Sequence, residues 1–510
     1  MLAIAHACAI IGLDGELVEV QVDFNPRAGI PSFTIVGLPD SAVRESRERV
    51  RAGIKNSGLR FPNKGYVVNL SPADLPKHST AYDLAIAVGV LAATDQIPLE
   101  ALDQALFVGE LSLDGRVRHS KGAMPMAYRA FQEGYETIYV PAEDASQAAL
   151  VDGIRVIPVD TLGQLVEHLY HLNPIQVFER DEIILNGATS NDVYVDFSQI
   201  KGQQHVKRAL EIAAAGNHNV RMVGVPGSGK SMMSRALPSI LPSMTFEEAI
   251  EVTRIYSVSD MLDSNQSLMT HRPFQSPHHT ISSAGLIGGG SIPKPGAVSL
   301  SHRGVLFLDE ITEFPNRILE LLRQPIEDKI VTISRAKQTL TFPANFMLIA
   351  AHNPCPCGNF GSKTLSCTCT PNMIKRYQAK LSGPLLDRID IHIEVPQVEY
   401  DKLMADMLSE TSETIRQRVE GARQRQQERF AKFPHIFANG DMGVGEIQQF
   451  CQMASDARQL LELSVRRMRL SARSYHRVLK LSRTIADIDE KQQIEVAHTA
   501  EALQYRPKME

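Results

Sequence analysis

The stretch Gly224-Val-Pro-Gly-Ser-Gly-Lys-Ser231 decides the fold class of this 510-residue chain. It follows a short β-rich run, Val220–Val223, and opens a segment of helical composition at residues 232–236. A strand, a glycine-rich turn and a helix in this order form a P-loop, in which backbone amides and the helix N-terminus surround a phosphate chain. The pattern predicts an α/β domain that binds nucleotide.

Each residue of the loop has a predicted part in binding ATP. The Lys230 ammonium reaches the terminal phosphates, and the Ser231 hydroxyl ligates Mg²⁺. An accidental glycine-rich turn is the alternative, and it leaves the Lys-Ser pair and the helix unexplained. The phosphate cradle itself is predicted to consist of Gly224, Pro226, Gly227, Ser228 and Gly229.

Two further strands end in polar side chains. Gly304-Val-Leu-Phe-Leu-Asp-Glu310 reads as a buried strand whose Asp309 can hold Mg²⁺ and whose Glu310 can orient or deprotonate the attacking water. A strand at 346–351 leads to Asn353, whose amide can bridge that water and the γ-phosphate. In a parallel sheet such residues gather at the carboxyl ends of the strands. A solvated Asp-Glu pair after an ordinary strand is the alternative.

The ordered set of P-loop, Leu-Asp-Glu strand, Asn-ended strand and a later Asp-Arg before an apolar strand resembles the AAA+ ATPases, and more narrowly their magnesium-chelatase-like branch. Within that branch the chain is similar to the ComM (YifB) competence proteins over essentially its whole length. The similarity lies in Ser276-Pro-His-His-Thr280, Gly288-Gly-Gly-Ser-Ile-Pro293, Val331-Thr-Ile-Ser-Arg335, Asn353-Pro-Cys-Pro-Cys-Gly358 and Leu381-Ser-Gly-Pro-Leu-Leu-Asp-Arg-Ile-Asp390.

The resemblance implies roles for three residues beyond the P-loop. Asn353 is the expected sensor-1 residue, and Arg388 is the expected arginine finger, which enters the site of a neighbouring subunit and so implies an oligomer. Arg473 is the expected sensor-2 residue at the start of a lid helix, with Arg477 as runner-up. From the residues alone, Arg388 has the alternative of a salt bridge to one of its flanking aspartates.

Four of the six cysteines lie close together, as Cys355-x-Cys357 and Cys367-x-Cys369. Their loop is rich in Pro, Gly, Asn and Lys and has no apolar face to bury thiols. A tetrahedral Cys₄ zinc site is the direct interpretation, and four protein ligands make it structural. Reduced thiols and a redox-active disulfide are the alternatives.

The length predicts at least two globular domains, and the protein is expected to be cytoplasmic. A chain with 43% hydrophobic residues can fill cores, a net charge of −5 confines any nucleic-acid surface to part of the molecule, and no apolar run is long enough to span a bilayer. Segments 75–83, 109–115 and 128–134 resemble the ribosomal S5-like fold of Lon-type proteases, and this resemblance implies a Lon-like, S5-like α/β domain at 1–170, followed by a linker at 171–198. An AAA+ domain at 199–396 and a helical lid at 397–510 are expected to follow.

The N-terminal domain raises a protease alternative, because it resembles Lon-type proteases in segments 75–83, 109–115 and 128–134. Ser79 or Thr80 stands at the nucleophile position. Met124, however, stands where the catalytic lysine belongs, and Lys121 is about one turn too early. We therefore expect a proteolytically inert domain.

Two insert-like segments are candidates for contact with DNA, at 273–300 and 328–342. In similar AAA+ helicases such inserts line the central pore. Cationic side chains can neutralise phosphates, and histidines can stack on bases, whereas a solvated hairpin is the alternative. The candidate contact residues are Lys294, Arg335, Lys337, His278 and His279.

The resemblance therefore implies a homohexameric AAA+ helicase that binds single-stranded or branched DNA and uses ATP and Mg²⁺ to drive branch migration in natural transformation. The residues by themselves argue for a Mg-ATP hydrolase with an inter-subunit site. Two alternatives remain, a magnesium-chelatase motor subunit with a protein partner and an ATP-driven chaperone or scaffold. The Lon-like domain and the Cys₄ loop count against the chelatase alternative.

Overall fold

The structure is a computed structural model that describes residues 1–73, 77, 79–179, 195–262, 267–290, 293–334, 339–362, 365–397, 410–433 and 435–507. The chain forms two compact units. The first comprises residues 1–184 together with 249–269, and the second comprises 185–248 together with 270–510. Each unit has its own sheet.

The first unit is built on a seven-stranded mixed sheet in the order β3-β4-β2-β1-β5-β8-β9. The central strands β1 and β2 are antiparallel, and β1 pairs in parallel with β5. The strands are β1 (Leu2–Ile11), β2 (Asp14–Asn25), β3 (Ser32–Val36), β4 (Gly65–Ser71), β5 (Ala105–Phe107), β8 (Thr137–Pro141) and β9 (Arg155–Val159).

Helices cover both faces of this sheet. Along β1, Ala3, Ala5 and Ala7 face a core built with α2, whereas Cys8 faces a second core built with α3. This alternation follows from the two-residue period of a strand. The helices are α1 (Ser41–Asn56), α2 (Asp83–Ala93), α3 (Ala123–Gln132), α4 (Ala145–Ala148) and α5 (Leu162–Leu169).

The second unit has a five-stranded parallel sheet in the order β11-β14-β17-β10-β18. The strand that leads to the P-loop, β10 (Val220–Val223), lies between β17 (Met347–His352) and β18 (Ile391–Glu394). Beyond β17 come β14 (Val305–Leu308) and β11 (Phe274–Gln275). The segments that follow β10, β14 and β17 therefore meet at one edge of the sheet.

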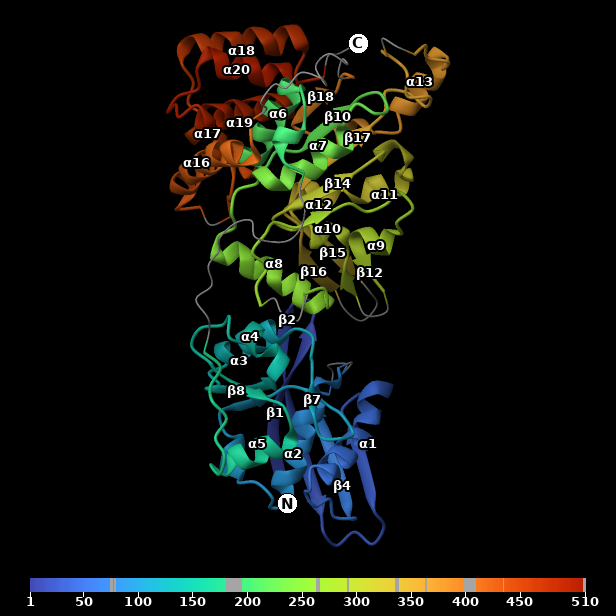
Figure 1. The fold of residues 1–510 in the computed structure, drawn as a ribbon, viewed down its shortest axis with the longest axis vertical. Helices are drawn as coiled ribbons and strands as arrows, with labels where there is room; N and C mark the ends of the chain where they lie inside the picture. Colours follow the sequence, from blue (N-terminus) through green and yellow to red (C-terminus); the bar gives the residue numbers. More distant parts are fainter. Residues whose placement is uncertain are drawn as a thin grey trace. The chain divides into compact units, whose positions relative to one another are not determined.

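A helical region packs against the sheet of the second unit, on α6 (Gln204–Gly216) (Figure 1). One hydrophobic core runs from β10 through α6 into these helices, so the sheet and the helices fold as one body. The helices are α16 (Ser412–Phe430), α17 (Val444–Phe450), α18 (Ser455–Met468), α19 (Ala472–Ile488) and α20 (Val496–Gln504).

Helices and hairpins connect the strands of the parallel sheet. The helices are α7 (Lys230–Ala236), α8 (Phe246–Ser259), α9 (Ser283–Ile287), α10 (Ala297–Leu300), α11 (Asn316–Leu321), α12 (Arg323–Asp328), α13 (Pro371–Gln378) and α14 (Gly383–Leu386). The hairpins pair β12 (Gly288–Gly289) with β13 (Lys294–Pro295) and β15 (Ile330–Ser334) with β16 (Thr339–Pro343).

The predicted fold class is confirmed: a mixed α/β chain with a parallel P-loop sheet and a helical C-terminal region. One central element was missed, because the sequence indicates strands only from Glu16 onward and β1 begins at Leu2. Alanine occupies four positions of β1 and has a low intrinsic preference for strands. Strand pairing on both sides of β1 decides its conformation.

Candidate nucleotide site

The P-loop has the backbone that a phosphate cradle requires. Gly227 and Gly229 adopt φ values of +74° and +90°, which disfavour any residue with a Cβ. A Cβ on Gly224 would lie 2.4 Å from the carbonyl oxygen of Val395, so this position also needs glycine. Among the described residues, the buried Ser228 Oγ has no hydrogen-bond partner, which suits an acceptor brought by a ligand.

Lys230 is buried at the start of α7 and connects the loop to the neighbouring strand. Its Nζ donates to the carbonyl oxygens of Gly224 at 2.7 Å and Val225 at 3.0 Å, and to Asn353 Oδ1 at 3.2 Å. Burial lowers the pKa of Lys230 from its ordinary value. The ammonium therefore lies between the P-loop and the predicted sensor-1 side chain.

Ser231 and Asp309 meet across the sheet edge. The Ser231 hydroxyl donates to Asp309 Oδ2 at 2.6 Å, although the two residues are far apart in sequence. Hydroxyl and carboxylate oxygens are ligands that Mg²⁺ accepts. This pair fits the predicted magnesium site because a single ion can contact both oxygens.

Glu310 has a backbone conformation that the sequence does not reveal. Its φ of 49° and ψ of 45° lie in the left-handed region, and its N–H donates to Asp309 Oδ1 at 3.0 Å. Such a conformation in a non-glycine residue costs of order 1–3 kcal/mol and is frequent at functional sites. The turn leaves the Glu310 side chain exposed beside the buried strand β14.

Arg221 of β10 and His352 of β17 form a hydrogen-bonded pair that the sequence analysis did not predict. His352 Nδ1 donates to the carbonyl oxygen of Asn353 at 2.6 Å, and His352 Nε2 accepts from Arg221 Nε at 2.9 Å. Burial and the Arg221 charge lower the pKa of His352 to about 3, so the ring is neutral. The ring therefore supports the backbone of Asn353. In the sequence, the one feature that could have indicated this role is a histidine at the end of an otherwise apolar strand.

Arg388 and Arg473 lie together on one carboxylate. Both form salt bridges with Glu327 of α12, and the Arg473 contact measures 3.2 Å. The sequence alternative for Arg388, a bond to a flanking aspartate, is not what the structure has. The runner-up Arg477 instead pairs with Asp390 at 3.6 Å.

Arg388 lies at the amino-terminal end of the parallel strands, whereas the P-loop lies at their carboxyl end. Val220 is in register with Ile391, and Val223 with Glu394. Arg388 thus precedes the start of β18, whereas the P-loop follows the end of β10. Four residues of strand separate these levels by about 13 Å.

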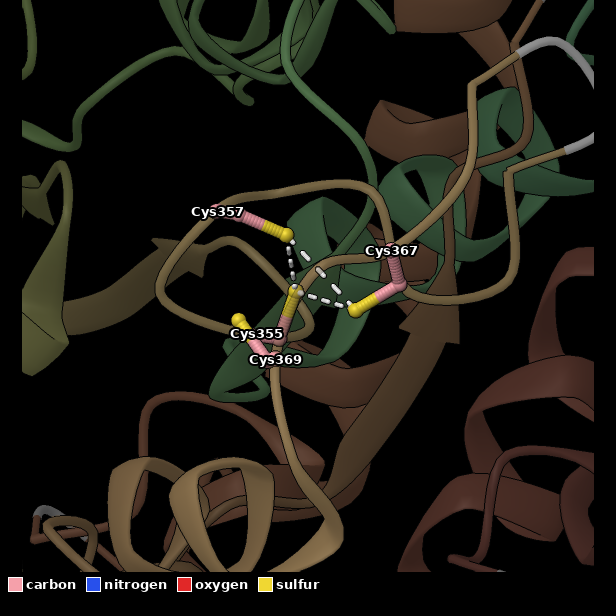
Figure 2. A group of neighbouring side chains, drawn as sticks. All are labelled: Cys355, Cys357, Cys367 and Cys369. Atoms are coloured by element: carbon pink, nitrogen blue, oxygen red, sulfur yellow. Dashed lines mark hydrogen bonds between the residues drawn. The ribbon is translucent and has the colours of Figure 1, made fainter.

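The four clustered cysteines converge as Figure 2 shows, and their sulfur atoms all lie within 4.8 Å of one another. Cys355 Sγ is 3.4 Å from Cys357 Sγ and 3.7 Å from Cys367 Sγ. A tetrahedral zinc ion with bonds of about 2.3 Å needs sulfur separations of about 3.8 Å. The cluster therefore has the size of a Cys₄ zinc site.

The cysteine loop packs directly on the P-loop. A Cβ on Gly358 would lie 2.6 Å from Cγ of Pro226. The helix α13 after the loop contacts the segment that follows Glu310, because Thr312 Oγ1 donates to the Tyr377 hydroxyl at 2.6 Å. The loop between the predicted sensor 1 and α13 thus adjoins the nucleotide site on two sides.

The two insert-like segments touch each other. A Cβ on Gly288, in the β12–β13 hairpin, would lie 2.9 Å from Ile333 Cδ1 in the β15–β16 hairpin. Lys294 is exposed on β13. The His278 and His279 rings lie 4.0 Å apart, and His279 also contacts Phe314. Arg335 and Lys337 lie outside the described residues.

The candidate protease residues of the first unit are engaged elsewhere. The Thr80 hydroxyl donates to Glu110 at 2.5 Å, and Ser79 Oγ accepts from the N–H of Ala81 at 3.1 Å. Lys121 forms a salt bridge with Asp260 at 2.5 Å, and Met124 is buried. These contacts favour the interpretation of an inert domain.

Comparison with known proteins agrees with this geometry. The chain is 41% identical to Competence protein ComM of Haemophilus influenzae over 99% of this chain and 97% of that protein. The chain belongs to the ComM/YifB family. It is also 39% identical to the uncharacterized protein YifB of Escherichia coli, over 99% of this chain and 97% of the relative.

Three family models place the ComM/YifB chain in the magnesium-chelatase-like AAA+ group. They are "Magnesium chelatase, subunit ChlI" at residues 196–403, "Subunit ChlI of Mg-chelatase" at 18–144 and "Magnesium chelatase, subunit ChlI C-terminal" at 409–506. The second covers most of the Lon-like domain. That domain therefore no longer counts against a chelatase-type motor, and only the Cys₄ loop still does.

Partial matches extend the same grouping of this ComM/YifB member. A 38 kDa magnesium-chelatase subunit of Rhodobacter capsulatus is 27% identical over 33% of the chain and 53% of that protein. Lon protease 2 of Bacillus subtilis is 26% identical over 34% of the chain and 33% of that protein. None of the described helices is long and apolar enough to cross a membrane.

Proposed function

We propose that this protein is an ATP-driven motor that acts on DNA in the cytoplasm, as a homohexamer that promotes branch migration during natural transformation and recombination. The observation that carries the proposal is the meeting of Lys230 with Asn353 and of Ser231 with Asp309 at one edge of the parallel sheet. These contacts unite the P-loop with the two strands predicted to serve hydrolysis.

The arrangement supports a mechanism for hydrolysis. Backbone N–H groups of the P-loop surround the phosphate chain, and Lys230 donates to the terminal phosphates. Ser231 and Asp309 are the residues that would hold Mg²⁺, which neutralises charge on the phosphate oxygens. Glu310 orients or deprotonates the attacking water, and Asn353 holds that water against the γ-phosphate.

The position of Arg388 supports an oligomer. Within one chain it lies a strand length from Lys230, too far to stabilise the transferred phosphoryl group in its own site. The site is completed when a neighbouring subunit places the surface that carries its Arg388 and Arg473 against this P-loop. Both arginines then exchange Glu327 for phosphate oxygens, which a guanidinium fork matches well.

Contact with DNA rests on two supports. The relative from Haemophilus influenzae is named a competence protein. The insert 273–300, which contains Lys294 and His278, packs on the insert 328–342 through Gly288 and Ile333, so the two inserts form one continuous surface. Lys294, with the predicted contacts Arg335 and Lys337, supplies the cations that phosphates require.

The four cysteines are proposed to hold one structural Zn²⁺. The convergence of the sulfur atoms to zinc-like separations supports this assignment over the two thiol alternatives. Four thiolate ligands leave no open position on the ion, so its contribution is to fix the loop that contains Gly358.

A chelatase-type motor that acts on a protein partner is the second candidate, favoured by the chelatase descriptions of all three family models. It shares the ATP site and differs in what stimulates hydrolysis. An ATP-driven chaperone or scaffold is the third. A scaffold keeps its function in Glu310→Gln, whereas a motor binds ATP and stalls.

The deciding experiment is steady-state ATP hydrolysis with single-stranded, duplex and forked DNA over a salt series. We expect several-fold stimulation that fades as salt rises, because phosphate contacts release counterions. Hydrolysis that is unchanged by every DNA would overturn the DNA proposal and favour the chelatase-type motor.

A further inference from the structure

A small polar cavity lies at the edge of the second unit's sheet opposite the P-loop. It borders Gly304 and Asn345, which precede strands β14 and β17, and the end of α6. Its volume is about 20 Å³, enough for one or two water-sized guests. The polar lining consists of Asn217, Glu248, Arg272, Arg303, Asn345 and Arg423.

Glu248 and Arg272 form a closed pair in this lining. Arg272 Nη2 donates to Glu248 Oε2 at 2.7 Å, and its remaining N–H groups donate to the carbonyl oxygens of Pro242, Ser243 and Arg303. Among the described lining residues, Glu248 is the only carboxylate, and Arg272 already neutralises it.

Arg423 of α16 brings a further positive charge to the cavity, which Glu248 and Asp441 attract. Its Nη1 and Nη2 donate to the carbonyl oxygens of Phe437 at 3.1 Å and Ala214 at 3.0 Å. Its Nε is shielded from solvent and has no acceptor among the described residues. The nearby Asp441 lies outside the lining and is 3.7 Å from Lys329 Nζ.

The surroundings of Arg423 are electropositive. The Arg303 guanidinium stacks on the Phe437 ring, with its Cζ 3.3 Å from the ring centroid. Burial alone would raise the pKa of Glu248, yet Arg272, Arg303 and Arg423 hold that pKa below its ordinary value. A buried cation in such a field is costly unless an anion accompanies it.

We propose that this cavity binds one monoatomic inorganic anion, chloride in ordinary salt, which accepts from Arg423 Nε. The bound anion links α16 to the starts of β14 and β17, so it stabilises the contact of the helical region with the sheet. This site is separate from the nucleotide site and does not depend on the proposed function.

The direct test uses crystals of the full-length protein grown in sodium bromide. We expect an anomalous peak in the cavity, within contact distance of Arg423 Nε. A cavity that holds only water, with bromide peaks confined to the exposed surface, would overturn the proposal. This result does not depend on the stability of any variant.

A second test measures the melting temperature while chloride replaces gluconate at constant ionic strength. We expect a rise of about 3 °C between low and 200 mM chloride. Arg423→Gln should abolish the rise. Arg425→Gln is the matched control, because Arg425 lies on the same helix and pairs with Glu490 outside the cavity.

Glu248→Gln keeps the proposal testable if Arg423→Gln fails to fold. This change removes the one carboxylate of the lining and leaves Arg272 in need of an acceptor. Chloride should then bind more tightly, so the rise in melting temperature should begin at several-fold lower chloride. A chloride response that is identical in wild type, Glu248→Gln and Arg423→Gln would overturn the proposal.

Discussion

Gly358 of the cysteine loop lies against Pro226 of the P-loop. A Cβ on Gly358 would be 2.6 Å from Cγ and 2.7 Å from Cδ of that proline, distances that side chains do not reach without displacement. Gly358 also has a φ of +83°. The proposed zinc loop is therefore built to fit the outer wall of the phosphate cradle.

Gly358→Ala should weaken ATP binding about tenfold, which corresponds to about 1.4 kcal/mol, because the added methyl displaces Pro226. Titration with a fluorescent ATP analogue measures the effect. Gly361→Ala is the matched control, since Gly361 has a similar φ of +79° but no atom within 4 Å of an added Cβ. Equal losses in both variants would show that backbone strain, and not the contact with Pro226, is responsible.

The purified protein should contain one zinc ion per chain, and Cys367→Ser should lose it and weaken ATP binding as Gly358→Ala does. Metal analysis together with thiol titration tests this. Cys451→Ala, at a buried cysteine outside the cluster, should retain zinc. A zinc-free protein with freely titrating thiols would support ordinary cysteines, and thiols recovered only by reductant would support a disulfide.

Glu310→Gln should bind ATP normally and hydrolyse it ~10²–10⁴-fold more slowly, because the amide cannot accept a proton from water. Nucleotide titration and single-turnover hydrolysis separate the two effects. Glu313→Gln is the control, as Glu313 lies in the same short turn after β14. A Glu310→Gln protein that still hydrolyses ATP at the normal rate would assign the base to another residue.

Lys230→Ala and Arg388→Ala should each be inactive alone and restore activity when mixed. Because the two residues lie at opposite edges of the sheet, a mixed ring contains sites with an intact P-loop from one chain and an intact Arg388 from the other. For random mixing at equal amounts, about a quarter of the sites should be complete.

Lys230→Ala mixed with Glu310→Gln is the control for this complementation, because both changes damage the P-loop side of the site. That mixture should stay inactive. If Lys230→Ala and Arg388→Ala also stay inactive together although they form mixed oligomers, the arginine does not act between subunits.

Stability should fall as the pH decreases below about 6.5, because two buried histidines must take up protons on unfolding. Burial lowers the pKa of both His352 and His392 from 6.5 to about 3. The stabilisation that the two neutral histidines contribute to the folded state is therefore complete above pH 6.5 and is lost as the pH falls toward 3. Between pH 6.5 and 5.0 each histidine should lower the free energy of unfolding, measured with urea, by about 2 kcal/mol.

His352→Gln isolates one of these contributions, since the amide can still donate to Asn353 and accept from Arg221. The loss of unfolding free energy between pH 6.5 and 5.0 should be smaller in this variant by the contribution of one histidine. His119 acts in a different range, because its hydrogen bond to Asp144 raises its pKa to about 9. Its stabilisation is complete below pH 6.5 and is lost as the pH rises toward 9. An unchanged pH dependence in His352→Gln would mean that His352 is not held neutral.

The local sequence pattern was sufficient to predict the parallel sheet that carries the P-loop. The strands before Asp309 and Asn353 carry runs of apolar residues that end at polar ones, and the strand before Gly224 is apolar except for Arg221 and leads directly into the glycine-rich loop. Such runs specify buried parallel strands whatever surrounds them, since both faces must be apolar. The pairing of the Cys-x-Cys motifs was likewise visible, because metal-ligand spacing is local.

The tertiary structure alone decided which distant residues share an environment. The sequence contains no sign that Glu327 holds Arg388 and Arg473, that His352 supports Asn353, or that Gly358 presses on Pro226. These contacts depend on the order of the strands and on how loops that are distant in sequence pack beside the same end of the sheet. Local patterns record which residues must be buried or must turn, whereas contacts between distant segments depend on packing, and packing is a property of the whole fold.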